Sequence, residues 1–502
     1  MTSNHHAEEL QENPQRLTTV TLVLLLLCSS FFALYNSNSA YTSDEVWSVK
    51  TAALSYSAEV AALKADVHPP LYFLILRLWV RLFGTGERVI RCLSGLFYIL
   101  SVLAVYGLGR ELYGKKAALL CTAIYLSSPL AILTAQFARM YSLLSLLSIL
   151  STWLYLQFLV KPRDSRLLFA LYVAVNVLGT LTHIAFFFLL FGQAVFHFLF
   201  YRRTSVKRFV VSIVLSAVPY LFLWAPIVWR QIGNSSEGLA WVQKPGLFSL
   251  GELLLLYGGA FWLLVPVLLY LWRRSGFESW REFSKLHTKR LTLWLLGITV
   301  LTPFLISQWK PIFNSRLAIV GLHFFALAIG ALIGRRISYF LIIELIVLTA
   351  IGIVFFRPET STCDNRAIAT YISRRVSDRD AVIFTSLTRL PIDFYLERQS
   401  GTKKLFETSF PAEIDNHPGY EGRINDPERK PALEREAAEL VDKISTMHLR
   451  ERGGRIFFLR GRHPQIDSIV EASLRKRFEL IPDEGLRCDE SSPYFKEIIV
   501  FK

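Results

Sequence analysis

The sequence predicts a polytopic α-helical membrane protein with about 11 transmembrane helices, followed by a soluble α/β domain. Of its 502 residues, 52% are hydrophobic, and the mean hydropathy is +0.37, which is too apolar for a soluble protein of this size. The apolar residues are grouped in segments long enough to cross a bilayer, but the chain changes character at Arg357-Pro358. We therefore expect a transmembrane domain at residues 1–356 and an α/β domain at residues 357–502.

The positions of the basic residues predict which side of the membrane each connection occupies. The apolar segments lie at roughly 17–36, 88–110, 116–136, 140–160, 166–182, 184–201, 208–229, 250–272, 291–308, 316–334 and 337–356. Lys and Arg gather in alternate connections, which the positive-inside rule assigns to the cytoplasm together with the N-terminus. The other connections, with Asp44, Glu45, Arg139, His183, Lys310 and Arg316, then lie outside. An odd number of crossings also places residues 357–502 outside, so we expect a plasma-membrane protein with an extracytoplasmic C-terminal domain.

The net charge of +15 is confined to the membrane part. From residue 357 onward there are about 25 side chains of each sign, so this part is neutral. A basic excess limited to the apolar part is typical of membrane topology, and no basic groove with interleaved aromatic residues is present in the sequence. These observations argue against nucleic-acid binding.

Two apolar segments near the N-terminus differ from ordinary spans. Residues 1–16 are slightly acidic, which is unlike the start of a signal peptide, so we expect residues 17–36 to be an uncleaved first helix. Residues 69–83 are too short to span easily and carry Arg77 and Arg81 on one helical face. We expect this segment to lie in the membrane interface, within the first outer loop.

The C-terminal part alternates strand-like and helix-like patterns. We expect strands at Ala381–Thr385, Arg455–Leu459, Phe478–Ile481 and Glu497–Phe501, and helices at Arg366–Val376, Pro431–Met447 and Ile466–Lys476. Residues 408–431 are polar and contain proline, which favours an irregular loop. Cys363 and Cys488 flank this part and could form a disulfide if it lies outside the cytoplasm, although two free thiols fit the sequence equally well.

Two adjacent carboxylates, Asp44 and Glu45, follow the first predicted helix. At the edge of a low-dielectric cavity, a carboxylate can accept a proton from a hydroxyl or amine nucleophile, while its neighbour holds the substrate or a basic partner. A purely structural alternative is that both acids favour the N-terminus of a helix that begins near Val46. The pair alone does not decide between these two roles.

Further polar residues occur in the connections assigned to the same side of the membrane. Pro69 and Pro70 start a helix abruptly and thereby direct Asp66 and His68 to a defined place. Arginine binds phosphate with two hydrogen bonds, and several cationic or protonatable groups share this side. The candidates are Arg139 with its neighbour Tyr141, His183, and Lys310 with Arg316. Each has a structural alternative, such as an arginine that snorkels to the interface, but together they predict a phosphate site.

In this arrangement the sequence resembles the C-type integral membrane glycosyltransferases that use polyprenyl-phosphate sugars. It is similar to the protein O-mannosyltransferase-like family (glycosyltransferase family 39) and to the lipid A aminoarabinose transferase group. The matching motifs run in family order over roughly residues 40–320. They are Asp44-Glu45, Asp66-Val67-His68-Pro69-Pro70-Leu71, Leu78-Trp79-Val80-Arg81-Leu82-Phe83-Gly84, Gln136-x-Ala138-Arg139-Met140-Tyr141, Thr182-His183 and Pro311-x-x-x-x-Arg316. Family members often have Tyr after the last Arg, where this chain has Leu317.

The resemblance implies a role for each of these residues. Asp44 would be the base that activates the acceptor, and Glu45 would help to position the acceptor or the sugar. His68, with Asp66 nearby, would lie beside the donor phosphate or sugar. The lipid phosphate would be bound by Arg139, His183 and Arg316, with Tyr141 and Lys310 beside them. Displacement at the anomeric carbon would release polyprenyl phosphate and invert the configuration.

Two other classes of function fit the sequence less well than a transferase. Transporters and flippases place ionisable groups near the middle of the bilayer in repeated halves, whereas the charges here gather at one face and no internal repeat stands out. A scaffold or sensor acting through the soluble domain would leave the membrane motifs without a purpose. The expected partners are a polyprenyl-phosphate sugar, membrane lipids and an acceptor of undetermined kind. An acidic pair beside a histidine could bind a divalent cation, but no ligand spacing requires one, so no metal site is predicted.

Overall fold

The fold is taken from a computed structural model of residues 1–502 and divides into two compact units. The first consists of residues 1–37, 51–230 and 244–356, and the second of residues 38–50, 231–243 and 357–502. The structure describes residues 14–502 except 66–67, 161–164, 201–205, 228, 230–241, 267–286, 334–338, 356–362, 386–387, 401–405, 416–426, 447–453, 462, 483–484 and 489–496.

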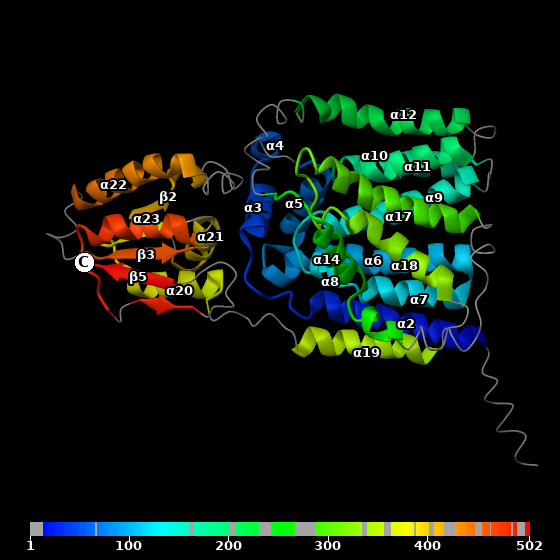
Figure 1. The fold of residues 1–502 in the computed structure, drawn as a ribbon, viewed down its shortest axis with the longest axis horizontal. Helices are drawn as coiled ribbons and strands as arrows, with labels where there is room; N and C mark the ends of the chain where they lie inside the picture. Colours follow the sequence, from blue (N-terminus) through cyan, green and yellow to red (C-terminus); the bar gives the residue numbers. More distant parts are fainter. Residues whose placement is uncertain are drawn as a thin grey trace, which may run out of the picture. The chain divides into compact units, whose positions relative to one another are not determined.

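The first unit is helical, with a helix at every apolar segment predicted from the sequence (Figure 1). Its long helices are α2 (Pro14–Leu34), α6 (Glu87–Tyr113), α7 (Lys115–Leu126), α9 (Tyr141–Tyr155, continued by η1, Leu156–Val160), α10 (Arg166–Thr180), α11 (Phe186–Phe200), α12 (Val206–Leu223), α14 (Leu247–Gly258), α17 (His287–Ile306), α18 (Ile319–Ile333) and α19 (Tyr339–Phe355). Three further helices of this unit are α4 (Tyr56–Ala65), α5 (Leu71–Phe83) and α8 (Pro129–Ala135). The predicted interfacial segment 69–83 thus contains α5.

Burial separates central helices from peripheral ones in this unit. Nearly all side chains of α7 are buried, and α7 packs against α6 and α18 (Figure 1). By contrast, α2 and α12 present large apolar side chains outward, including Leu27 at 62% and Phe222 at 78% exposure. Exposed apolar surface on this scale is unfavourable in water but is suited to lipid. The unit therefore has the character of a membrane-embedded bundle.

The predicted span 116–136 is not one straight helix. It consists of α7 and α8, which are bent by 62° at a short break. Pro129 is the first residue of α8 and cannot continue the hydrogen bonding of the preceding helix, which explains the break. By length and composition, four described helices can cross a membrane, or five if this bent pair is one span. The other six apolar helices are 10–17 residues long, so the predicted total of about 11 spans remains a prediction.

A buried ion pair fixes α4 to α5 in the loop that precedes α6. Arg77 donates from Nη1 to Glu59 Oε2 at 2.8 Å and to the Leu54 carbonyl at 2.8 Å. Glu59 is fully buried and Arg77 is 8% exposed. A charge taken out of water is tolerated when it is paired in this way. Arg77, predicted to face the membrane interface, is instead directed into the protein.

The second unit is an α/β fold around a five-stranded sheet with the order β2-β1-β3-β5-β4. Its strands are β1 (Ala381–Thr385), β2 (Phe406–Phe410), β3 (Ile456–Arg460), β4 (Leu486–Arg487) and β5 (Glu497–Phe501). β2, β1 and β3 are parallel, whereas β5 is antiparallel to both of its neighbours. The helices are α3 (Ser43–Ala53), α20 (Asn365–Arg375), α21 (Arg389–Ser400), α22 (Lys430–Thr446) and α23 (Pro464–Arg475).

Helices cover both faces of the parallel strands, as a fully buried central strand requires. α22 and α23 contribute Leu433, Val441 and Val470 to the core on one face, while α20 and α21 pack together beside the other (Figure 1). The chain moves from β1 to β2 on one side and then returns to β3 on the other side of β1. This reversal makes the ends of β1 and β3 the switch point of a doubly wound sheet.

The predicted pattern of strands and helices is partly correct. β1 and β5 have the predicted bounds, and β3, α20, α22 and α23 differ from the predictions by one or two residues. Phe478–Ile481 is not a strand, since it contributes only an isolated bridge between Leu480 and Phe501. β2 lies partly inside the predicted irregular loop 408–431, of which residues 416–426 lie outside the described part of the chain. α21 was not predicted.

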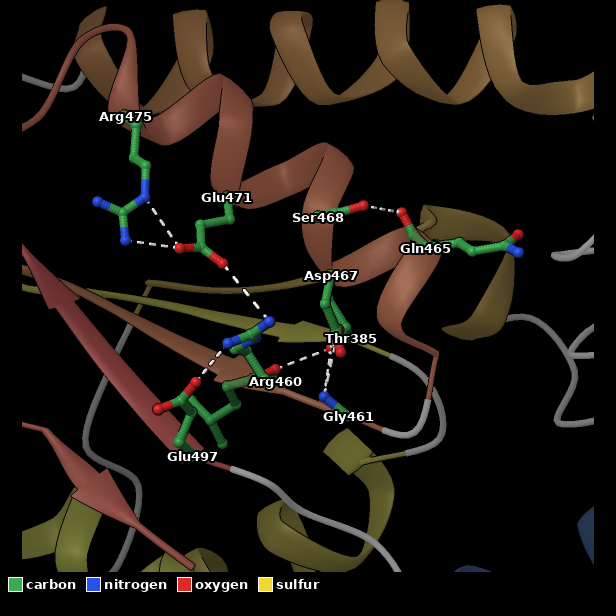
Figure 2. Close-up of polar contacts among 10 residues, drawn as sticks. Thr385, Arg460, Gly461, Gln465, Asp467, Ser468, Glu471, Arg475 and Glu497 are labelled. Carbon is green, nitrogen blue, oxygen red and sulfur yellow. Dashed lines mark hydrogen bonds and ion pairs between the residues drawn. The ribbon is translucent and has the colours of Figure 1, made fainter.

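The switch point between β1 and β3 is filled by a side chain of the domain itself (Figure 2). Asp467 is fully buried, and its Oδ1 lies 2.6 Å from the Thr385 hydroxyl and accepts from the Gly461 amide at 3.2 Å. These bonds tie α23 to the carboxyl ends of both strands. Doubly wound folds usually bind ligands at this place, but here a buried carboxylate occupies it. The contact is therefore structural.

A disulfide joins the two predicted flanking cysteines of the α/β domain. Cys363 and Cys488 are bonded, with their Cα atoms 5.5 Å apart and a sequence separation of 125 residues. Cys363 immediately precedes Asp364, the N-cap of α20, and Cys488 follows β4. The bond therefore fixes the start of α20 to the antiparallel edge of the sheet.

Removal of this disulfide is expected to destabilise the second unit strongly. A cross-link that closes a loop of this length restricts the unfolded chain, and its loss lowers the free energy of unfolding by about 4 kcal/mol. The variant with Cys363→Ser and Cys488→Ser should therefore show earlier proteolysis of the α/β domain on heating. Cys92→Ser, which leaves the bond intact, is the control. If the double variant and Cys92→Ser resisted proteolysis to the same temperature, the disulfide would not be stabilising.

A second prediction concerns pH and the acidic pair Asp393 and Glu407. Burial and the charge of Glu407 raise the pKa of Asp393 to about 7, against the opposing effect of Arg389 and Lys50. Because this pKa is higher in the folded than in the unfolded state, the free energy of unfolding falls as pH rises from about 4 to about 7 and is not recovered above. Asp393→Asn should weaken this dependence and stabilise the domain at pH 8 by on the order of 1 kcal/mol.

Calorimetry of wild-type protein and Asp393→Asn at pH 5 and pH 8 would test this expectation. The exposed Asp442, replaced by Asn, controls for the loss of a carboxylate as such. If the free energy of unfolding changed with pH by the same amount in wild-type protein and in Asp393→Asn, Asp393 would not be the titrating group.

Candidate functional site

The two adjacent carboxylates have different environments at the start of α3. Thr42 and Glu45 form a reciprocal capping pair: Glu45 Oε2 accepts from the Thr42 amide at 3.0 Å, and the Thr42 hydroxyl accepts from the Glu45 amide at 3.3 Å. Glu45 is fully buried, whereas Asp44 is partly exposed. The structural alternative raised from the sequence thus applies to Glu45, and the Asp44 side chain remains accessible. Both residues belong to the second unit.

In the first unit, His68 and His183 come together although they are more than a hundred residues apart. Their ring centroids are 5.7 Å apart. The amide of Leu71, the first residue of α5, donates to the carbonyl of Leu181 at 3.0 Å, which joins the two segments. Pro69 and Pro70 direct the chain into this contact.

His183 is buried and is held in one orientation. Its Nδ1 accepts from the Ala185 amide at 3.0 Å, which leaves Nε2 as the hydrogen-bond donor of the neutral ring. Burial, assisted by His68 and Arg139, holds the pKa of His183 well below its usual value. His183 is therefore a neutral donor and not a cation.

An aromatic pair continues the cluster from His183 to Arg316. Tyr141 lies 5.9 Å from the His183 ring and stacks on Phe137 with an interplanar angle of 7°. The guanidinium of Arg316 lies over the other member of the pair, 4.8 Å from the Phe137 centroid. Stacking on an aromatic ring fixes the orientation of the guanidinium plane.

Arg139 belongs to the same cluster through a tight turn. Its amide donates to the Phe137 carbonyl at 2.7 Å, and that carbonyl also accepts from Ser94 Oγ of α6 at 2.8 Å. The Arg139 side chain is 6% exposed and lies 5.9 Å from the Phe73 ring of α5. Arg139 is close enough to lower the pKa of His183. The positive charge of this part of the cluster therefore comes from the Arg139 guanidinium and not from the neutral His183 ring.

The remaining predicted site residues are less constrained. Lys310 is exposed in the turns that follow α17. Asp66 lies outside the described residues. Within the part of the chain that the structure describes, no three residues among His, Cys, Asp and Glu come together as potential metal ligands.

The structure adds three residues to those predicted from the sequence. Phe137 links Tyr141 to Arg316, and Ser94 holds the turn that carries Arg139. Arg91 of α6 is 3% exposed and donates to the Ser37 carbonyl at 3.0 Å, which fixes the end of the first helical segment. An arginine inside an apolar helix is the signal that could have identified Arg91, because such a charge requires a partner.

These contacts define a cluster of His68, His183, Tyr141, Arg139 and Arg316, with Phe137 as its support. We call it the phosphate-site cluster after the role that the sequence predicts for these residues. It combines two guanidinium groups, a fixed imidazole donor and a phenol hydroxyl. Groups of this kind bind phosphate oxygens and stabilise negative charge that develops on a leaving group.

The chain is similar to known proteins in sequence and in fold. Residues 67–229 match the family described as dolichyl-phosphate-mannose-protein mannosyltransferase. The putative mannosyltransferase YkcB of Bacillus subtilis is 24% identical in an alignment of 220 residues, which covers 40% of this chain and 29% of that protein. The chain therefore matches less than a third of that relative's length.

The solved structures of ArnT from Cupriavidus metallidurans resemble this chain over almost its whole length. The apo structure has a TM-score of 0.58 and 13% identity, with 97% of this chain and 98% of ArnT covered. The structure bound to undecaprenyl phosphate has a TM-score of 0.56 and 13% identity, with 96% and 97% covered. The resemblance predicted from the sequence is thus confirmed as a similarity: residues 67–229 match the mannosyltransferase family, and the fold of the chain is similar to that of ArnT, a membrane glycosyltransferase of the C type.

Proposed function

We propose that the protein is a glycosyltransferase that moves a sugar from a polyprenyl-phosphate donor to an acceptor on the outer face of the membrane. The observation that carries this proposal is the phosphate-site cluster, in which Arg139, His183 and Arg316 come from three separate segments. The bound undecaprenyl phosphate of ArnT, whose fold this chain shares, supports a lipid phosphate as the ligand.

Asp44 is the proposed catalytic base. It removes the proton from the acceptor hydroxyl or amine as that nucleophile attacks the anomeric carbon, and the bond from this carbon to the phosphate oxygen breaks. Polyprenyl phosphate leaves with the bonding electrons, and the cluster stabilises its charge. A single displacement inverts the anomeric configuration. Glu45 supports Asp44 by capping α3.

The disulfide supports an extracytoplasmic position for residues 357–502. Disulfides persist in oxidising compartments and are rare in the cytoplasm, and the bond between Cys363 and Cys488 lies within this domain. Together with the basic residues in alternate connections, it favours a cytoplasmic N-terminus and a site on the outer side of the inner membrane.

The proposal is tested with purified protein and undecaprenyl phosphate carrying a radiolabelled sugar. Native mass spectrometry should show binding of undecaprenyl phosphate, and release of unlabelled lipid phosphate should accompany transfer of the label. A transporter or flippase would move the lipid between leaflets of a vesicle without separating sugar from phosphate, and that result would replace the proposal.

A further inference from the structure

The segment that carries Asp44 packs as a part of the C-terminal α/β unit. Residues 38–50 belong to that unit, although they lie more than three hundred residues before it in the chain. Two side chains from the α/β domain hold the backbone of Tyr41. The Tyr41 amide donates to Tyr395 Oη at 2.8 Å, and its carbonyl accepts from Asn365 Nδ2 at 2.7 Å.

Further contacts reinforce this attachment on both sides of Tyr41. The Tyr41 ring is fully buried and meets Phe394 edge to face, with centroids 5.7 Å apart. Arg366 donates to the Asn38 carbonyl at 3.2 Å, and Lys50 pairs with Glu397 at 2.9 Å. The segment is therefore attached near its start, at its middle and at its end.

The residues that make these contacts are themselves held firmly. Asn365 is the first residue of α20, next to the N-cap Asp364, which accepts from the Ala367 amide at 2.8 Å. Cys363, with its disulfide, comes immediately before this cap. Tyr395 belongs to α21, which packs against α20. The contact on Tyr41 thus originates from the rigid part of the domain.

The hydrogen bonds on the Tyr41 backbone lie close to Asp44 in the chain. Tyr41 is followed directly by Thr42, whose capping pair with Glu45 starts α3, and Asp44 lies in this first turn. Fixing both polar groups of the Tyr41 backbone therefore determines where α3 begins and how Asp44 is presented. Ordinary burial of Tyr41 would not require that both its amide and its carbonyl be bound by side chains of the domain.

We propose that the α/β domain serves the transfer reaction by holding Asp44 in place, with Tyr395 and Asn365 as positioning residues. This inference rests on the proposed function, in which Asp44 is the base. It gives the domain a direct part in the chemistry, through residues that hold the base.

The first test is hydrogen exchange of the full-length protein in detergent. Tyr395→Phe keeps the ring and removes only the hydroxyl that accepts from the Tyr41 amide. Loss of one buried hydrogen bond should accelerate exchange of the amides in residues 41–46 about fivefold to tenfold. Gln399→Ala is the matched control, because Gln399 of α21 bonds Thr370 of α20 and not the segment.

The second test is kinetic. Tyr395→Phe and Asn365→Ala should each lower kcat about fivefold to tenfold and leave KM for the lipid-linked donor unchanged, since a misplaced base affects the chemical step and not donor binding. A general loss of folded protein would instead lower the active fraction, which titration with undecaprenyl phosphate measures. Gln399→Ala should match wild-type protein in both constants.

The outcomes separate this inference from the function on which it rests. Unchanged exchange in Tyr395→Phe, or faster exchange with wild-type kcat, would overturn the positioning role while leaving transferase activity intact. Full transfer by Asp44→Asn would instead overturn the base assignment, and with it the role of the domain in catalysis. Faster exchange together with a lower kcat and constant KM is the expected result.

Discussion

Asp44→Asn is expected to lower the turnover of sugar transfer by at least about 100-fold, the usual contribution of a general base. The amide has nearly the same size as the carboxylate but cannot accept the proton of the acceptor. Asp44 is partly exposed, and α3 is capped by Thr42 and Glu45, so the substitution should not unfold this helix. Binding of undecaprenyl phosphate should persist, because the phosphate-site cluster is unchanged. Single-turnover transfer and native mass spectrometry measure the two quantities separately.

The controls for this prediction use the other carboxylates of the second unit. Asp442→Asn makes the same chemical change at a side chain that is 54% exposed in α22 and should leave transfer unchanged. Glu45→Gln tests the neighbour, whose fully buried carboxylate caps α3. If Asp44→Asn turned over substrate as fast as Asp442→Asn, Asp44 would not be the base.

Most helices of the first unit could be predicted because lipid imposes one simple requirement. A chain in hydrocarbon must satisfy its backbone polar groups internally, so every long apolar segment becomes a helix. The break between α7 and α8 was missed because hydropathy is insensitive to a single proline such as Pro129. A break that depends on one residue, such as this proline, is therefore not predicted by the hydropathy pattern.

In the α/β unit, the sequence pattern predicted some strands and missed others. β1 was predicted because its residues are buried on both faces and form a short apolar run. β2 contains Glu407 and Ser409 and is only partly buried at its start, so its pattern is too polar to stand out. The attachment of residues 38–50 to this unit depends on single hydrogen bonds from Asn365 and Tyr395, which no periodicity reveals.

The candidate site was predicted residue by residue but not as an arrangement. Topology placed His68, Arg139, His183 and Arg316 on one side of the membrane, yet it could not state which of them meet. Their contacts arise from tertiary bonds, such as that between the Leu71 amide and the Leu181 carbonyl, and from the Phe137 ring beneath Arg316. For Glu45, predicted as a catalytic residue, the structure shows a contact that caps α3 together with Thr42.

Arg316→Ala is expected to raise the Kd for undecaprenyl phosphate about 10- to 100-fold, the effect of losing a charged hydrogen-bond donor. Arg316→Lys should fall between alanine and wild type, because it keeps the charge but loses the planar group that stacks on Phe137. KM for the acceptor should change little, since the guanidinium is proposed to bind the lipid phosphate alone. Arg81→Ala removes the same charge from an exposed position of α5 and should bind the lipid normally. An unchanged Kd in Arg316→Ala would remove this residue from the phosphate site and leave Arg139 as its principal cation.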